Sequence, residues 1–104
     1  MMIYHLISRQ GLDAQTDSEF ILDDANLAAG FIHCCTAEQL HGVIKRFFPG
    51  DNSQLMVVEL DPDALSEELK WEPATDSDGL FPHIYGPINR SAILRVTPYA
   101  TNVG

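Results

Sequence analysis

The chain has 104 residues, which is the length of one domain with one hydrophobic core and too short for two. Hydrophobic residues make up 45% of the chain, a share that argues against disorder. Fifteen acidic residues against six basic ones give a formal net charge of -9, so phosphates would repel the protein. We therefore expect one globular domain over residues 1–104, with neither duplex nucleic acid nor an anionic membrane as its partner.

The lack of a recognisable targeting signal and the use of cysteine lead us to expect a cytoplasmic protein. No stretch approaches the ~20 apolar residues of a membrane span, and residues 1–5 lack the basic start of a signal peptide. The two cysteines, Cys34 and Cys35, are adjacent, and neighbouring cysteines pair only in a strained ring. We expect both to be reduced thiols.

Three strands and one helix are predicted in the first half of the chain. Residues 2–7 are apolar except for one histidine, and residues 31–34 form a second short apolar run. The stretch between them is polar and gives a weak signal, with a short strand at residues 19–22. The helix begins with a capping box, Thr36 and Gln39. Its apolar face has residues at i, i+3, i+4 and i+7, namely Leu40, Val43, Ile44 and Phe47. Pro49-Gly50 ends the helix.

The second half predicts two further strands and a short helix. Residues 54–60 are apolar throughout and predict a strand covered on both faces. Asp61-Pro62 is an N-cap followed by proline, which predicts a helix over residues 63–69. Residues 81–87 hold two prolines and a glycine, a composition that excludes a regular central strand. Residues 91–97 alternate, which places Ala92, Leu94 and Val96 on the buried face of a strand. The result is an α+β domain with about five short strands and two helices.

The first candidate site lies where the strand at residues 31–34 meets the helix. Free N–H groups and the helix dipole at such a junction attract an anion. Thr36 and Gln39 are fully explained as caps but also lie where a ligand would bind. His33 is an imidazole in an apolar strand, where an unpaired polar group costs about 1–3 kcal/mol. A functional histidine and one satisfied by a backbone carbonyl both remain open.

The second candidate site combines residues 71–72 with residues 81–87. An extended segment places Phe81, His83 and Tyr85 on one side, and rigid irregular backbone beside such residues is typical of binding sites. Trp71 is expected in the core or in a cleft wall. Glu72 is held extended by the proline that follows it. The alternative is a proline-braced crossover whose aromatic side chains fill the core.

His5 adds a third imidazole, in the first predicted strand, where it needs a polar partner. His41 falls among polar positions of the predicted helix, and we expect it in solvent. The sequence has no Cys-x-x-Cys, no His-x-x-x-His and no glycine-rich phosphate loop, so it predicts no metal site.

These blocks resemble the bacterial domain-of-unknown-function 952 family over nearly the whole chain. The resemblance is carried by residues 3–6 (Ile-Tyr-His-Leu), 30–34 (Gly-Phe-Ile-His-Cys), 36–39 (Thr-Ala-Glu-Gln), 69–72 (Leu-Lys-Trp-Glu) and 81–87 (Phe-Pro-His-Ile-Tyr-Gly-Pro). The chain departs from the family at Cys35, where a serine is expected. It is also short between the first strand and Glu19.

The family is similar in architecture to the ADP-ribosyltransferase superfamily, which implies a split β-sheet and a cleft for a nicotinamide dinucleotide such as NAD. Residue by residue, the resemblance places His5 on the first strand and the Cys35-Thr36 junction near a second strand. It places Glu72 or His83 at the later acidic or polar position. A small residue usually follows the first-strand histidine in the superfamily, whereas Leu6 stands here.

Three hypotheses for function follow. In the first, His5, His33, Glu72 and His83 do the chemistry of an ADP-ribosyltransferase-like enzyme, with Glu72 stabilising an oxocarbenium-like centre. Its nucleotide ligand is bound by Thr36, Gln39, Trp71 and Tyr85. The second is a non-catalytic module that binds a small ligand or a protein. The third is a metal-dependent hydrolase using His33, Glu72 and His83. The direction of Glu72, into the cleft with His5 and His33 or out to solvent, separates the first two.

Overall fold

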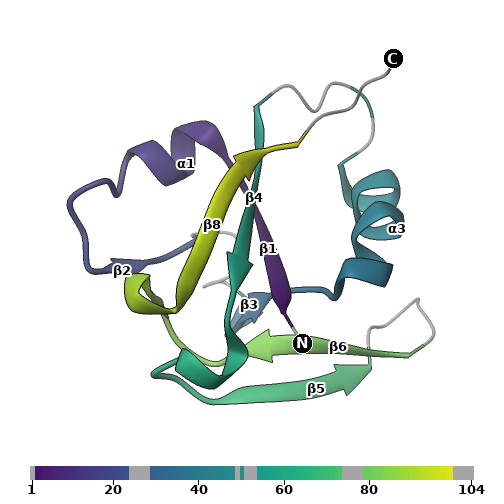
Figure 1. Ribbon diagram of the computed structural model, residues 1–104. Helices are drawn as coiled ribbons and strands as arrows, with labels where there is room; N and C mark the ends of the chain where they lie inside the picture. The colour runs from purple at the N-terminus through teal and green to yellow at the C-terminus, as the bar shows by residue number, and fades with distance from the viewer. Residues whose placement is uncertain (1, 24–28, 49, 51–53, 74–78, 100–104) are drawn as a thin grey trace.

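The computed structural model describes residues 2–23, 29–48, 50, 54–73 and 79–99, and these form a small α+β domain of antiparallel sheets (Figure 1). One sheet has the order β1-β4-β8, with bounds Ile3–Ser8, Leu55–Leu60 and Ile93–Pro98. A second has the order β3-β6-β5, with bounds Ile32–His33, Leu80–Ile84 and Leu69–Pro73. Strands β2 (Phe20–Ile21) and β7 (Ile88–Asn89) pair with each other. Helices α1 (Arg9–Asp13) and α3 (Ala37–Phe47) lie within the described ranges.

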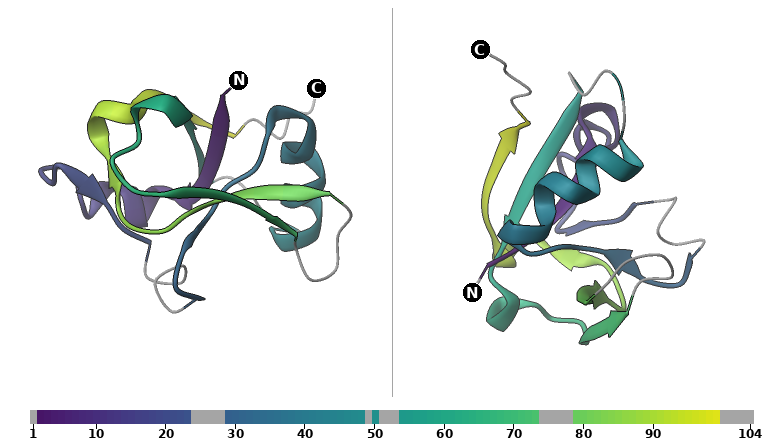
Figure 2. Two further views of the ribbon diagram at one scale, coloured as in Figure 1. Left: turned by 90° about the horizontal axis from the view of Figure 1, so that it is seen from below. Right: turned by 90° about the vertical axis from the view of Figure 1, so that its right-hand side faces the viewer.

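Strand β4 is the centre of the fold, and both of its faces are buried as its continuous apolar run predicts. On one face Val58 and Leu60, both fully buried, pack with Ile84 and the rest of the main core. On the other face Val57 packs with Ile44 of α3. Leu12 of α1 packs on the main core, so helices α1 and α3 lie on opposite sides of the β1-β4-β8 sheet (Figure 2). No helix in the described ranges is long and apolar enough to span a membrane.

All five expected strands are present, as β1, β2, β3, β4 and β8. The capping box of α3 is also confirmed: the Thr36 hydroxyl accepts from the Gln39 backbone N–H at 3.3 Å, and Gln39 Oε1 accepts from the Thr36 N–H at 2.9 Å. One detail of the helix is wrong. Phe47 is 62% exposed, and Phe48, after the last helical residue, packs against the core instead.

The helix expected over residues 63–69 is wrong. Asp61 caps only one 3₁₀ turn, Pro62–Ala64, by accepting from the backbone N–H of Asp63 at 3.0 Å. Leu65 is already extended, with φ -67° and ψ 137°, and it packs against the main core. Burial of apolar side chains by extended backbone thus overrides the local helix signal.

The exclusion of a central strand from residues 81–87 is also wrong, because β6 lies between β3 and β5. The N and C=O of one residue in an antiparallel strand point toward the same neighbour. The carbonyl of Pro82 accepts from the N–H of Cys34, one residue beyond the end of β3. The missing N–H of Pro82 therefore faces Cys34 at the end of the pairing with β3, so the proline removes one bond at the end of that ladder and none between Ile32–His33 and β6.

The placement of Leu94 in the core is wrong as well. Glu59 pairs with Arg95 and Leu60 pairs with Ile93, so Leu94 is the extra residue of a β-bulge in β8. The bulge shifts the alternation by one position. Ile93 therefore packs on the main core, while Leu94 is 53% exposed.

Candidate functional site

One face of the β3-β6-β5 sheet gathers four of the expected site residues. His33 of β3 pairs directly with His83 of β6. Glu72 lies in β5, and Tyr85 lies one residue past β6. The Glu72 carboxylate accepts hydrogen bonds from Tyr85 and from His83, so both residues belong to the same group of side chains as the two histidines. We call these residues, together with Phe31, the histidine–aromatic cluster.

The rings of the cluster pack around Phe31, whose side chain is half-buried. The Phe31 ring stacks on His83 at a centroid distance of 4.2 Å, and it contacts His33 at 4.6 Å and Tyr85 at 5.3 Å. The His33 and His83 rings meet edge to face at 5.3 Å. His83 is buried, whereas His33 is exposed. The cluster therefore places one exposed imidazole, that of His33, beside a packed layer of rings.

The carboxylate of Glu72 is the anion of the cluster. Its Oε1 accepts from the Tyr85 hydroxyl at 2.5 Å and from His83 Nδ1 at 2.9 Å. The hydrogen bond from Tyr85, and then that from His83, lower the pKa of Glu72 from its ordinary value of 4.5. The same bond to Glu72 is the main cause that raises the pKa of Tyr85 above 10.0. At neutral pH the pair is thus a carboxylate and a phenol that donates to it.

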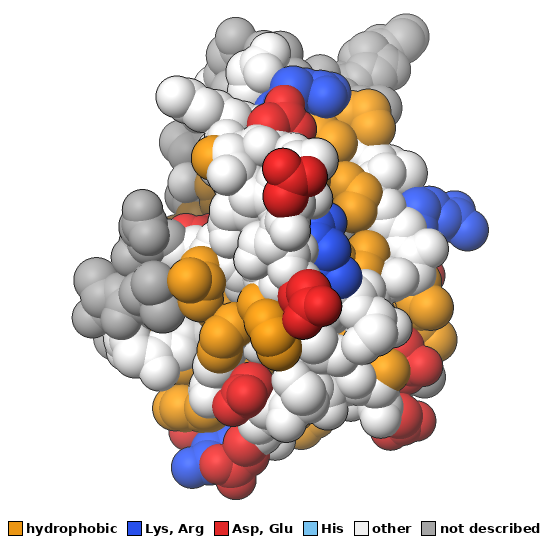
Figure 3. Space-filling view, turned by 90° about the vertical axis from the view of Figure 1, so that its left-hand side faces the viewer, with side chains coloured by type: hydrophobic (Ala, Val, Ile, Leu, Met, Phe, Trp, Pro, Cys, Tyr) orange, Lys and Arg blue, Asp and Glu red, His pale blue; other side chains and the backbone are white. Residues whose placement is uncertain are grey.

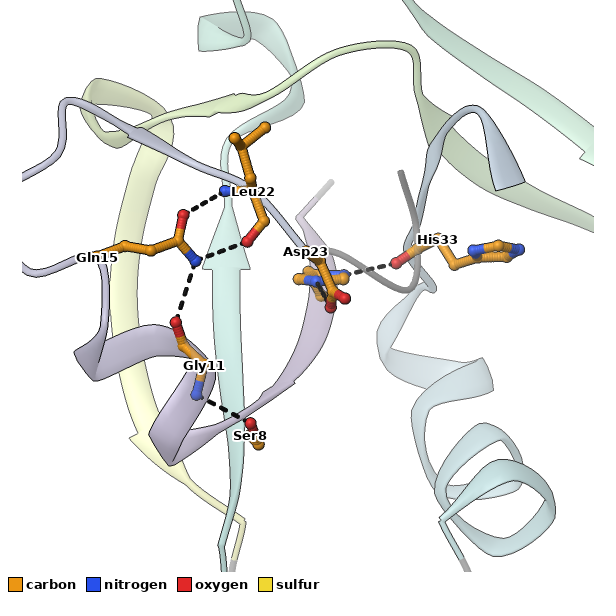
Figure 4. A network of polar contacts seen from close by, with 7 residues as sticks. Ser8, Gly11, Gln15, Leu22, Asp23 and His33 are labelled. Carbon is orange, nitrogen blue, oxygen red and sulfur yellow. Dashed lines mark hydrogen bonds and ion pairs between the residues drawn. The ribbon is translucent and has the colours of Figure 1, made fainter. Parts of the chain in front are cut away.

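His5 lies behind the cluster and is almost fully buried, at 2% exposure. Its Nδ1 is 2.7 Å from the backbone carbonyl of His33, and its Nε2 is 3.1 Å from Oδ2 of Asp23. Figure 4 shows the His33 imidazole pointing away from Asp23, so the two lie on opposite sides of the His33 backbone. His5 therefore supports the strand that presents His33 and has both ring nitrogens engaged within the protein.

The other three expected ligand-binding residues lie apart from the cluster. The Thr36 hydroxyl and the Gln39 amide are engaged in the capping box, and Gln39 Nε2 also donates to the carbonyl of Leu80 at 2.8 Å. Trp71 stands between Lys70 and Glu72 in β5, and alternation along a strand places it on the opposite face of the sheet. It is 40% exposed, which corrects its expected place in the core.

The structure adds three residues that the sequence reading did not select. Phe31, two positions before His33, shares its face, and this spacing was the available signal. Lys70, two positions before Glu72, carries its ammonium 4.9 Å from the centre of the Tyr85 ring. Asp23 lies in a polar stretch with no periodic pattern, so no sequence signal points to its contact with His5.

The cysteines are buried away from solvent, and the described residues offer no group of metal ligands at this cluster. Cys34 and Cys35 are buried free thiols, as expected. Burial raises the pKa of Cys35 to about 12 and the pKa of Cys34 well above its ordinary value. Within the described ranges, no three His, Cys, Asp or Glu side chains are grouped so that they could hold a metal ion. The metal-dependent hydrolase therefore has no support from the geometry.

Net charge does not locate the site either. Figure 3 shows acidic side chains at separate places on one face, with basic and hydrophobic side chains between them. The excess of acid is thus spread over that face and forms no single charged patch on it.

The exposed imidazole of the cluster makes stability depend on pH. Burial first, and then the charges of His83 and His5, lower the pKa of His33 from its ordinary value of 6.5, against an opposing effect of Asp23. As the pH falls below about 6.5, the His33 imidazole takes up a proton more readily in the unfolded chain than in the folded chain. The free energy of unfolding should therefore decrease as the pH falls. Urea unfolding at about pH 7.5 and about pH 5.5, on either side of the ordinary value, measures the loss.

His33→Gln should make that loss smaller, because the substituted side chain does not titrate. His41→Gln, at an exposed position of α3, is the matched control and should leave the loss unchanged. Equal losses in the wild type and in His33→Gln would contradict the prediction.

Comparison with known proteins gives a family and a solved relative. The family model described as "Protein of unknown function (DUF952)" matches residues 7–96. The crystal structure of protein CC0527 from Caulobacter crescentus is similar at 31% identity and a TM-score of 0.82, over 93% of this chain and 84% of that one. The solution NMR structure of CC0527 gives 32% identity, a TM-score of 0.77, and coverage of 93% and 83%. No curated protein matches the sequence. Because the family model covers most of its length, the chain belongs to the DUF952 family.

Proposed function

We propose that the histidine–aromatic cluster binds a nucleotide such as NAD and that the protein is an ADP-ribosyltransferase-like enzyme. The observation that carries this proposal is the state of Glu72. Its carboxylate turns toward His83, accepts hydrogen bonds from His83 and Tyr85 on Oε1, and leaves 33% of the side chain exposed. A preorganised carboxylate at a protein surface is suited to stabilise the positive charge that develops when a ribose C1′–N bond breaks.

The chemical groups around Glu72 fit the parts of NAD. Both recorded hydrogen bonds to Glu72 end on Oε1, and within the described residues none ends on Oε2, which is left for a ribose hydroxyl or for C1′. Exposed His33 offers a flat ring to a base. Lys70, 48% exposed beside the Tyr85 ring, offers a cation to the pyrophosphate. These groups support the proposal that a nucleotide binds here, although the chain as a whole carries a net negative charge.

The direction of Glu72 also bears on the second hypothesis, a non-catalytic binding module. A carboxylate that turned to solvent would favour the module, whereas this one is hydrogen-bonded to His83 and Tyr85, and to neither His5 nor His33 among the described contacts. The enzyme is therefore the function that the geometry supports best. Thr36, Gln39 and Trp71, which lie apart from the cluster, are not needed for it.

A ligand screen by thermal shift tests the proposal. NAD, ADP-ribose, ATP and nicotinamide are compared, and a true ligand at a hundred times its Kd should add about 2.7 kcal/mol of stability. We expect NAD and ADP-ribose to raise Tm. Glu72→Ala should reduce that rise, because it removes the acceptor for the ribose.

Glu19→Ala is the matched control, since it removes an equally charged but exposed carboxylate outside the cluster. A rise in Tm that is equal in wild type and Glu72→Ala would place the ligand elsewhere. No rise with any of the four compounds would overturn the nucleotide proposal.

A further inference from the structure

The side chain of His83 is held in one defined state by its neighbours. A carboxylate is an acceptor only, so the 2.9 Å contact between His83 Nδ1 and Glu72 Oε1 requires the proton to be on Nδ1. The lowered pKa of Glu72 keeps that oxygen a carboxylate at neutral pH. In a neutral ring the lone pair is then on Nε2.

The position of Nε2 follows from the hydrogen bonds of the described chain. Among the described residues, Nε2 of His83 has no hydrogen-bond partner, although the residue is only 5% exposed. At the same time, none of the described residues has a buried side-chain nitrogen or oxygen that lacks a partner. Nε2 therefore reaches the surface, while Phe31 covers the ring face at 4.2 Å.

A histidine that serves packing alone does not need this arrangement. His5, also buried, shows the structural case in the same protein, because both of its nitrogens have partners inside the chain. In His83 one nitrogen is fixed by a carboxylate and the other is presented outward. This is the arrangement by which a carboxylate orients an imidazole that accepts a proton from a substrate.

We propose that His83 is the general base of this site, positioned by Glu72 and Tyr85, and that the group it activates is a hydroxyl, either of water or of an alcohol. The inference rests on the proposed function and names the acceptor class for it. The hydroxyl oxygen forms a bond to ribose C1′ as the C1′–N bond breaks. Nicotinamide leaves with that bonding pair, and the hydroxyl proton passes to Nε2 of His83. The imidazolium that results is then paired with the Glu72 carboxylate.

The first measurement needs no ligand. Long-range ¹H–¹⁵N NMR spectra of the wild type report which ring nitrogen of each histidine carries the proton. We expect His83 to be protonated on Nδ1 at a pH where it is neutral, and Glu72→Ala to remove this preference. A His83 ring protonated on Nε2 in the wild type would overturn the proposal whatever NAD does.

The second measurement is the consumption of NAD with water or a small alcohol as acceptor. His83→Gln should lower the rate by a factor of about 100 or more, the usual effect of losing a general base, and should leave the thermal shift with NAD in place. That retained shift also shows that the variant is folded. His41→Gln, an exposed histidine of α3, should keep the wild-type rate.

The two measurements separate the inference from the proposed function. NAD binding with an unchanged rate in His83→Gln would overturn the general base and leave the nucleotide site standing. A wild type that binds NAD and consumes none would do the same. If NAD does not bind, the proposed function fails. The NMR measurement of the His83 tautomer then still shows whether Glu72 positions the His83 imidazole.

Discussion

Replacing Leu60 by alanine should lower the free energy of unfolding by about 3–5 kcal/mol, whereas Leu94→Ala should cost less than about 1 kcal/mol. Both changes remove the same atoms. Leu60 is fully buried in the main core at the centre of the fold, and its loss leaves a cavity that rigid neighbours cannot fill. Leu94 is 53% exposed. Urea denaturation of the two variants beside the wild type gives the comparison.

This pair tests the bulge in β8, because the bulge alone decides which residue of that strand faces the core. With unbroken alternation Leu94 would be buried and the two substitutions would cost similar amounts. Equal costs would therefore contradict the register in which Leu60 pairs with Ile93. Ile93→Ala should cost more than Leu94→Ala for the same reason, since Ile93 packs on the main core.

Local signals in the sequence were sufficient where the structure is local. The capping box of α3 involves residues three positions apart, and the apolar run of β4 indicates burial on both faces wherever its partners come from. Both were predicted. The bulge and the central place of β6 depend on which strand lies alongside, and a single sequence does not contain that pairing. Pro82 fits in β6 because its missing N–H faces the residue after the end of β3.

The same distinction explains the site. His33, Glu72, His83 and Tyr85 were selected because polar groups in apolar or rigid segments need an explanation, and the β3-β6-β5 sheet brings all four together. Trp71 was grouped with Glu72 by position along the chain, but neighbours in a strand point to opposite faces. Asp23 could not be found, because its role depends on contact with His5, 18 positions away.

His5 also shows why a shared location does not imply a shared role. Its ring is engaged by the His33 carbonyl and by Asp23, so its contribution to the site passes through the backbone of β3. A positioning residue of this kind should show its effect first in stability. Substitution of His83, which presents Nε2 outward, should show its effect first in chemistry.

His5→Ala should lower the free energy of unfolding by about 3 kcal/mol. The change removes the ring that contacts the His33 carbonyl and the Asp23 carboxylate, in a part of the fold where His5 itself is 2% exposed. Each of these two acceptors loses a hydrogen bond in a buried place, and the missing ring adds a cavity. Urea unfolding at neutral pH measures the loss.

Two further variants show whether that cost comes from the ring contacts of His5. His5→Asn keeps a donor near the position of Nδ1 but cannot reach Asp23, so its cost should lie between those of the wild type and His5→Ala. His41→Ala removes an exposed imidazole from α3 and should change stability by no more than about 0.5 kcal/mol. If His5→Ala were as mild as His41→Ala, the buried bonds of His5 would contribute nothing, and β3 would need another explanation for holding His33 in place.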